Sequence, residues 1–241
     1  MSSHLKLTHI SFSINHQSIL RNIDLEVAQG DFLVLVGANG SGKSTLLKVI
    51  NGHYVATHGS ICLKGKRLEN YKQSELSRTI VTLNQFVCDS LFIDLTVAEN
   101  MRLIAAAHKI PHQIMVENFL QLLNQFNPAL KQVLNRKVKD FSGGEQQVLA
   151  FALYLQLQPQ LLLLDEHTSA LDPKTAYKIM QFTRQVLIKR RLTAIMTTHR
   201  LEDALECGNR LIAMADGTIV YQALTQDKRS LNRQKLLEFC Y

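Results

Sequence analysis

The stretch "FLVLVGANGSGKSTLLKVI", from Phe32 to Ile50, combines a strand, a glycine-rich loop and a helix. Phe32–Val36 is a continuous apolar run, which is typical of a central strand covered on both faces. Gly37–Thr45 follows the pattern G-x-x-x-x-G-K-[S/T], whose backbone N–H groups point inward at an anion. The helix that follows adds the positive end of its dipole. The stretch therefore predicts a phosphate-binding loop in an α/β fold.

Each polar residue of this loop has an expected place around a nucleotide. Lys43 is expected to reach the β- and γ-phosphates, Ser44 to ligate Mg²⁺, and Thr45 to lie near the α-phosphate. A glycine-rich turn with a chance lysine is the plain alternative, but the strand before it and the helix after it argue against that. The other expected ATP contacts of the loop are Gly37, Asn39, Gly40, Ser41 and Gly42.

A second stretch, "LLLLDEHTSALD" from Leu161 to Asp172, places two adjacent carboxylates after an apolar run. Such a pair is electrostatically costly unless a cation or a proton transfer keeps it there. With a phosphate loop upstream, Asp165 is placed to hold Mg²⁺ through water, and Glu166 to take a proton from the attacking water. Alone, the stretch is weak evidence, because acids end many strands of α/β sheets.

The remaining patterns indicate an organisation around a parallel sheet. Apolar runs at 161–164 and 192–198 resemble the central strand at 32–36, and each has a helical pattern beside it. Asp216-Gly217 predicts a hairpin turn. From Phe86 to Gln158 the pattern is helical almost throughout. Alternating apolar residues predict two antiparallel strands near the N-terminus: Ile10, Phe12 and Ile14, then Ile23, Leu25 and Val27.

Composition excludes several classes of protein. The 241 residues suit one compact α/β unit, and the formal net charge of +7 is spread over short basic clusters, which favours solvated helix faces over a nucleic-acid stripe. The four cysteines form no CxxC pair, so neither a zinc site nor a disulfide scaffold is predicted, and a reducing cytosol fits. No apolar run is long enough to cross a bilayer, so any role at a membrane is expected to pass through a partner.

The stretch "FSGGEQQ", from Phe141 to Gln147, resembles the signature of ABC-type ATPases, whose usual form is LSGGQ. "TLNQ" ending at Gln85, "SALD" ending at Asp172 and "TTHR" containing His199 complete the motif series of that family in its usual order. The resemblance runs from about Leu5 to Tyr221. It implies a P-loop NTPase core with a mainly parallel central sheet, an N-terminal antiparallel β-subdomain and an inserted α-helical subdomain.

On that resemblance the chain is predicted to be a single ABC ATPase domain spanning residues 1–241. Residues 1–85 and 159–225 would form the core with its antiparallel β-subdomain, and residues 86–158 the helical subdomain that carries the signature. Residues 226–241 would form a helical tail.

The resemblance also implies that ATP lies between two subunits, a homodimer or a pair of nucleotide-binding subunits. Ser142, Gly143 and Gly144 of one chain would then face the phosphate loop of the other. Gln85 would contact Mg²⁺ and the attacking water, Asp172 would lie at the dimer seam, and His199 would bond the γ-phosphate. The implied catalytic residues are Glu166, His199, Gln85 and Lys43, and the implied metal ligands are Ser44, Gln85 and Asp165.

The sequence departs from the family pattern in three places. Phe141 and Glu145 replace the leucine and glutamine of the signature, a change expected to spare the Ser-Gly-Gly contacts. His167 stands where proline is most frequent in the family. We interpret it as a structural or surface residue. A histidine here also resembles the pattern of a bacterial subgroup linked to uptake of aromatic amino acids or similar solutes. Ile14 occupies the position of the adenine-stacking aromatic ring, with Phe12 expected on the same face of its strand.

The leading functional hypothesis is an ATP-hydrolysing subunit that energises a separate integral membrane permease, most similar to bacterial importers. It would work in the cytoplasm at the inner face of the membrane, together with an extracytoplasmic solute-binding protein. The alternative is a soluble ABC ATPase acting in iron-sulfur assembly or on nucleic acid. The signature argues against a small-molecule kinase built on the same loop.

Overall fold

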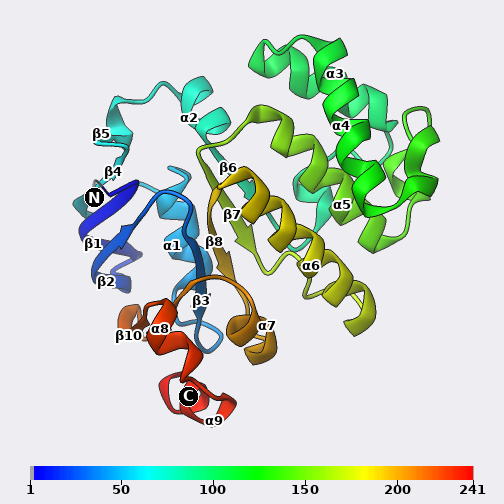
Figure 1. Cartoon of the computed structure of the whole chain (residues 1–241). Coiled ribbons are helices and arrows are strands. Elements are labelled where there is room, and N and C mark those ends of the chain that lie inside the picture. The colour runs from blue at the N-terminus through cyan, green and yellow to red at the C-terminus, as the bar shows by residue number, and fades with distance from the viewer. Residues whose placement is uncertain (1–2, 241) are drawn as a thin grey trace.

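The computed structural model describes residues 3–240, which form two sheets and a block of helices (Figure 1). The larger sheet has six strands in the order β10-β9-β3-β8-β7-β6. All are parallel except β10, which pairs with β9 in the antiparallel sense. The strands are β3 (Phe32–Val36), β6 (Ile80–Leu83), β7 (Leu161–Asp165), β8 (Thr193–Thr197), β9 (Arg210–Ala215) and β10 (Thr218–Ala223).

The central strands are apolar throughout because both faces of this sheet are covered. In β3, Leu33 and Leu35 belong to one core cluster while Phe32, Val34 and Val36 belong to the other. The predicted strands at 32–36, 161–164 and 192–198 are thus confirmed, and so is the hairpin, whose turn has Asp216 and Gly217 at φ 47° and 75°. The sheet separates two hydrophobic cores.

The smaller sheet has the order β2-β1-β4-β5 and covers one of these cores. The predicted alternation is found in β2 and, up to Phe12, in β1, whereas Ile14 is exposed; the two strands pair antiparallel with shifts in register. The helix α1 follows the glycine-rich loop, and its buried leucines and isoleucine lie in the same core as Leu5, Leu7 and Ile10 of β1. The bounds are β1 (Leu5–Ile14), β2 (Gln17–Val27), β4 (His58–Leu63), β5 (Lys66–Arg67) and α1 (Lys43–Ile50).

The helical block contributes to the core on the other face of the central sheet (Figure 1, green). It comprises α3 (Val97–His108), α4 (His112–Phe126) and α5 (Gly143–Tyr154), with short 3₁₀ turns between α4 and α5. Helix α2 (Gln73–Thr79) precedes β6. The helices α3 and α5 both begin with a capping box, in which an N-cap hydroxyl and a glutamate three residues later satisfy each other's backbone N–H groups.

The C-terminal part continues with α6 (Pro173–Arg190) and α7 (Leu201–Glu206), and ends with α8 (Thr225–Arg229) and α9 (Arg233–Cys240). This last pair, the expected helical tail, packs on the core: Phe239 stacks on Tyr221 of β10 with ring centroids 4.1 Å apart. Lys228 is buried and donates to the carbonyl oxygens of Cys207 and Gly208, and burial lowers its pKa to about 8.

The predictions about membrane-spanning segments and cysteines are compared here with residues 3–240. In this range no helix is long and apolar enough to span a bilayer. Cys62, Cys88 and Cys207 are free thiols, while the side chain of Cys240 lies outside what the structure describes.

Candidate functional site

The glycine-rich loop between β3 and α1 has a backbone that only glycine adopts without strain at two positions. Gly37 has φ 151°, and a Cβ there would lie 2.2 Å from the carbonyl oxygen of Met214. Gly42 has φ 99° at the N-cap of α1, and its Cβ would lie 2.9 Å from Leu20. Because side chains are excluded at both points, the loop keeps its backbone close to the strands beside it.

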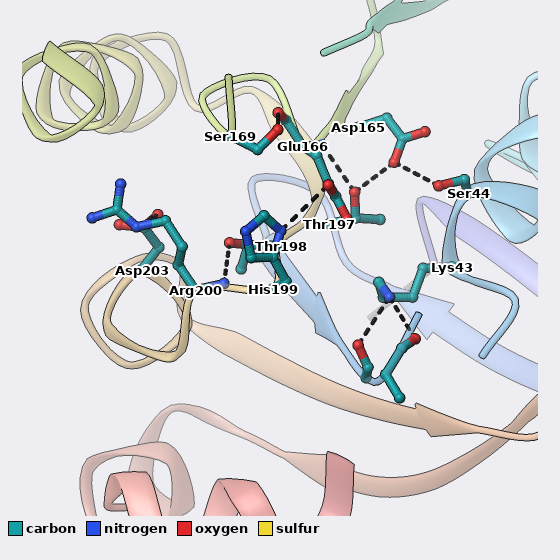
Figure 2. A network of polar contacts seen from close by, with 12 residues as sticks. Lys43, Ser44, Asp165, Glu166, Ser169, Thr197, Thr198, His199, Arg200 and Asp203 are labelled. Atoms are coloured by element: carbon teal, nitrogen blue, oxygen red, sulfur yellow. Dashed lines mark hydrogen bonds and ion pairs between the residues drawn. The ribbon is translucent and has the colours of Figure 1, made fainter. Parts of the chain in front are cut away.

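Lys43, the first residue of α1, is buried beside this loop. Its ammonium group donates to the carbonyl oxygens of Gly37 and Ala38, both at 2.9 Å (Figure 2). The hydroxyl of Ser41 is also buried, and within residues 3–240 it has no hydrogen-bond partner. A buried cation and an unsatisfied buried hydroxyl beside a glycine-rich loop are features suited to binding an anion.

Asp165, at the end of β7, joins three segments that are distant in sequence. Its Oδ1 accepts hydrogen bonds from Ser44 Oγ at 3.0 Å and from Thr197 Oγ1 at 2.6 Å. Thr197 ends β8 and is the direct partner of Asp165 in the parallel register. A hydroxyl and a carboxylate side by side are the oxygen ligands that Mg²⁺ takes, usually with few protein ligands. In the described part of the chain, no group of three or more His, Cys, Asp or Glu is placed to hold a metal ion.

Glu166 follows directly and has a left-handed backbone, with φ 48°. Its N–H donates to Thr197 Oγ1, and its carbonyl oxygen accepts from the N–H and hydroxyl of Ser169 at 2.9 and 2.8 Å. The Oε2 of Glu166 lies 3.3 Å from Nδ1 of His199 (Figure 2). The neighbouring structure thus holds a strained backbone in place and directs this carboxylate to the edge where β7 and β8 end.

The signature residues form a separate group at the start of α5. Ser142 is the exposed N-cap, and its hydrogen bonds run to Glu145 and Gln146 of the same helix. Gly144 lies close to the first turn of α6, where an added Cβ would be 2.3 Å from Thr175 Cγ2. Gly143 has more space, with Leu171 at 3.4 Å. Of these residues, Gly144 therefore packs against the start of α6, while Ser142 and Gly143 are exposed.

Gln85 and Asp172 each have a structural contact that the sequence does not predict. The carbonyl oxygen of Gln85 accepts from the side-chain amide of Gln147 on α5 at 2.7 Å, whereas among residues 3–240 no hydrogen bond joins the Gln85 side chain to Asp165. Asp172 is the N-cap of α6, and hydrogen bonds from the side chain and backbone of Thr175 hold the pKa of its carboxyl below the usual value.

The two residues named for the expected adenine position differ in exposure. Ile14 is exposed at the end of β1, as an adenine contact requires, with 43% of its surface accessible. Phe12 is instead buried and stacks on Tyr54, with ring centroids 5.0 Å apart. The ring of Phe12 is therefore packed in the core, whereas Ile14 lies at the exposed end of the strand.

His167 is buried, which agrees with a structural role and excludes the surface alternative. Its side chain is 3% exposed, and in the described structure neither ring nitrogen has a hydrogen-bond partner. Burial lowers the pKa of the imidazole to about 4, so the ring is neutral at pH 7.

Two residues with clear contacts in the site were not selected from the sequence. Thr197 bonds both Asp165 and the backbone of Glu166, and Gln147 ties the segment after β6 to the signature helix. The ends of neighbouring parallel strands meet at one edge of a sheet, so Thr197 was detectable once β7 and β8 were adjacent. No local pattern distinguishes Gln147 from other helical glutamines.

Comparisons with known proteins agree with this geometry. A family model described as "ABC transporter" matches residues 20–169. A protein of Clostridioides difficile (strain R20291) named "Tyrosine transport ATP-binding protein" is 33% identical over 230 residues, covering 92% of this chain and 90% of that protein. One of Halalkalibacterium halodurans named "Bacitracin export ATP-binding protein BceA" is 32% identical over 211 residues, covering 87% and 82%.

Solved structures show the same fold. The cbiO1 protein of Clostridium perfringens, described as part of an ABC transporter complex, superposes with a TM-score of 0.85 at 22% identity, covering 99% of this chain and 94% of that one. An ATP-binding cassette solved as a dimer in a post-hydrolysis state, bound to ADP and Pi, superposes with a TM-score of 0.76 at 26% identity, covering 92% and 98%.

Proposed function

This chain belongs to the ABC transporter family of ATP-binding proteins and is an ATPase, and from that premise we propose that it energises solute uptake through a permease formed by separate chains. The observation that carries the proposal is the group Ser44, Asp165, Thr197, Glu166 and His199 beside the phosphate loop. A carboxylate pair tied to a phosphate loop is suited to nucleotide hydrolysis coupled to work elsewhere.

Uptake is preferred over export on two grounds. Relatives named for thiamine import and for spermidine/putrescine import are 33% and 34% identical to this chain, although one named for bacitracin export is 32% identical. The histidine at position 167 also matches the pattern of the subgroup linked to uptake of aromatic amino acids. An aromatic amino acid is therefore the first solute to test. The complete system would then include a permease, a solute-binding protein outside the membrane, and this chain at the inner face.

The phosphate loop is proposed to bind the triphosphate of ATP. Backbone N–H groups of Gly37, Asn39, Gly40, Ser41 and Gly42 would surround it, with Thr45 near the α-phosphate and Ile14 against the adenine. The ammonium of Lys43, already directed into the loop, would exchange a carbonyl partner for the β- and γ-phosphates. When bound, Mg²⁺ held by Ser44, Asp165 and Gln85 would neutralise phosphate charge.

Glu166 is proposed as the general base of hydrolysis. It accepts a proton from water as the water oxygen bonds the γ-phosphorus and the bond to the β–γ bridging oxygen breaks, releasing ADP and phosphate. His199, 3.3 Å from this carboxylate, would orient it and donate to the γ-phosphate. Their positions at the ends of adjacent strands support these roles.

The signature is proposed to complete the site of a second copy. Ser142 is exposed, and its N-terminal helix position directs N–H groups outward, as binding a γ-phosphate from another chain requires. Asp172, at the start of the helix against which Gly144 packs, would lie at the seam. The division into a core (1–85 and 159–225), a helical arm (86–158) and a tail (226–241) is proposed on the same basis. The iron-sulfur and nucleic-acid alternatives gain no support from the relatives.

The proposal is tested by comparing two carboxylate variants. Glu166→Gln keeps the geometry but removes the proton acceptor, so the ATPase rate should fall about 10²–10⁴-fold while ATP still binds and dimerises the chain. Asp165→Asn should instead weaken Mg²⁺-dependent ATP binding and dimerisation. Size-exclusion chromatography in Mg²⁺ and ATP, together with phosphate release, distinguishes them. Near wild-type turnover by Glu166→Gln would overturn the assignment of the base, with His199 the next candidate.

A further inference from the structure

Glu145 binds the hydroxyl group that the proposed function assigns to ATP. Both Ser142 Oγ and Ser142 N–H donate to Glu145 Oε2, at 2.9 and 3.0 Å, and Ser142 Oγ accepts from the Glu145 N–H at 3.4 Å. A serine hydroxyl has a single proton to donate. In this structure that proton is engaged by a carboxylate of the same chain.

We propose that Glu145 competes with the γ-phosphate of the facing chain for Ser142, and so weakens the ATP-driven pairing of two chains. This inference rests on the proposed composite site. For Ser142 to donate to a phosphate, its hydroxyl must turn away from Glu145 Oε2. The carboxylate then remains about one hydrogen-bond length from the serine, where it repels the incoming phosphate.

Charge is the feature of Glu145 that opposes ATP, because the capping box does not need it. The box forms with either glutamate or glutamine at this position, so an uncharged side chain can satisfy the Ser142 N–H. The positive end of the α5 dipole attracts a carboxylate as it attracts a phosphate. The Glu145 carboxylate therefore already lies at the positive end of the α5 dipole, which would otherwise attract the phosphate.

The chain contains a matched capping box away from the signature. At the start of α3, Thr96 N–H and Oγ1 donate to Glu99 Oε2 at 2.7 and 2.8 Å, and Thr96 Oγ1 accepts from the Glu99 N–H at 3.2 Å. The two boxes have the same connectivity, but Thr96 has no proposed contact with ATP. Glu99→Gln is therefore the control for removing one cap charge.

The experiment measures the monomer–dimer equilibrium of the full chain by analytical ultracentrifugation in Mg²⁺ and ATP. All variants carry Glu166→Gln, so that bound ATP is retained. Glu145→Gln should lower the ATP concentration at half-maximal dimerisation about tenfold, and Glu99→Gln should leave it unchanged. The gain should shrink between about 50 mM and 500 mM salt, because salt screens the repulsion.

Further readouts separate a structural effect from competition. Thermal unfolding without nucleotide should be similar for Glu145→Gln and its parent, since the cap is retained. Glu145→Ala, which loses the side-chain half of the capping box and the charge, should unfold earlier and still dimerise at lower ATP. An unchanged midpoint in Glu145→Gln, an equal gain in Glu99→Gln, or a gain independent of salt would each overturn the inference while leaving the composite site intact. Failure of the parent to dimerise at any ATP concentration would overturn both.

Discussion

The phosphate loop with its carboxylates and the signature at the start of α5 differ in how they are built. In the first region, Ser44, Asp165 and Thr197 come from α1, β7 and β8, and their hydrogen bonds join residues more than thirty positions apart. In the second, the bonds of Ser142 stay within its own helix. The first region is a product of the tertiary fold, whereas the second is a local helix cap like that of α3.

The two regions also differ in exposure, and this difference agrees with the proposed division of labour. Lys43 is buried and already directed into its loop, whereas Ser142 is exposed and, among residues 3–240, bonds only within its own turn. A local cap acquires a catalytic role only from what is placed opposite it. The comparison therefore predicts that a defect in the phosphate loop stops hydrolysis of the ATP bound by the same chain. A defect in the signature should stop hydrolysis of the ATP bound by the partner chain.

The largest expected effect comes from combining two variants, one defective in the phosphate loop and the other in the signature. Lys43→Ala removes the cation of the loop and should reduce ATPase activity at least tenfold, about 1.5 kcal/mol. Ser142→Asp keeps a good N-cap but sets a negative charge against the phosphate, and should also inactivate. In a mixture, the mixed dimer carries both defects in one site and none in the other.

Phosphate release by the mixture should therefore exceed that of either variant alone at the same total concentration. As a control, two samples of Lys43→Ala that carry different tags are mixed, which shows whether subunits exchange between dimers. If the mixture is no more active than the average of its components although mixed dimers form, the two regions act within one chain and the composite site is wrong.

The sequence predicted the elements whose patterns follow from burial on both faces or from tight turns. It predicted β3, β7, β8 and the β9–β10 hairpin, and the helical character of residues 86–158. It did not predict β4, β5, α2 or the edge strand β6, because their sequences show neither a long apolar run nor a regular alternation.

The candidate site was predictable to a similar extent. Motif spacing placed Lys43, Ser44, Asp165 and Glu166 together, as the structure has them. The contact of Thr197 with Asp165 depends on which strands are neighbours, which is a tertiary property. The environment of Phe12 is likewise a tertiary property, because its ring stacks on Tyr54 in the core.

A smaller effect should follow from disturbing the packing of the signature on α6. A Cβ at Gly144 would lie 2.3 Å from Thr175 Cγ2, and β-branched threonine cannot swing away easily. Gly144→Ala should therefore destabilise the chain by about 2 kcal/mol, roughly 4–8 °C in Tm. Gly143→Ala, where the nearest atom is 3.4 Å away, is the matched control and should unfold near the wild-type temperature.

Thr175→Ser provides the rescue, because it removes the obstructing methyl group and keeps the hydroxyl. The double variant with Gly144→Ala should recover most of the lost Tm in thermal unfolding without nucleotide. Equal melting temperatures for the two alanine variants would mean that α5 does not pack on α6 as closely as the structure has it.

The smallest effect concerns Asp172, which caps α6 and is proposed to lie at the seam. Asp172→Ala loses the hydrogen bond to the Thr175 N–H and should lower the Tm by roughly 2–4 °C, whereas Asp172→Asn keeps an N-cap and should not. Hydrogen bonds from Thr175 lower the pKa of the Asp172 carboxyl, so the stabilisation is present above about pH 4 and is lost as pH falls through the folded-state pKa.

Thermal unfolding at neutral pH and near pH 3 therefore separates the variants. The Tm difference between wild type and Asp172→Ala should shrink at the lower pH, and Asp172→Asn should keep its advantage over alanine. If Asp172→Asn is as stable as wild type but needs more ATP to dimerise, the carboxylate acts at the seam as well as in the cap. Dimerisation unchanged by either substitution would confine Asp172 to α6, leaving Ser142 and its glycines as the signature region's contact with the second chain.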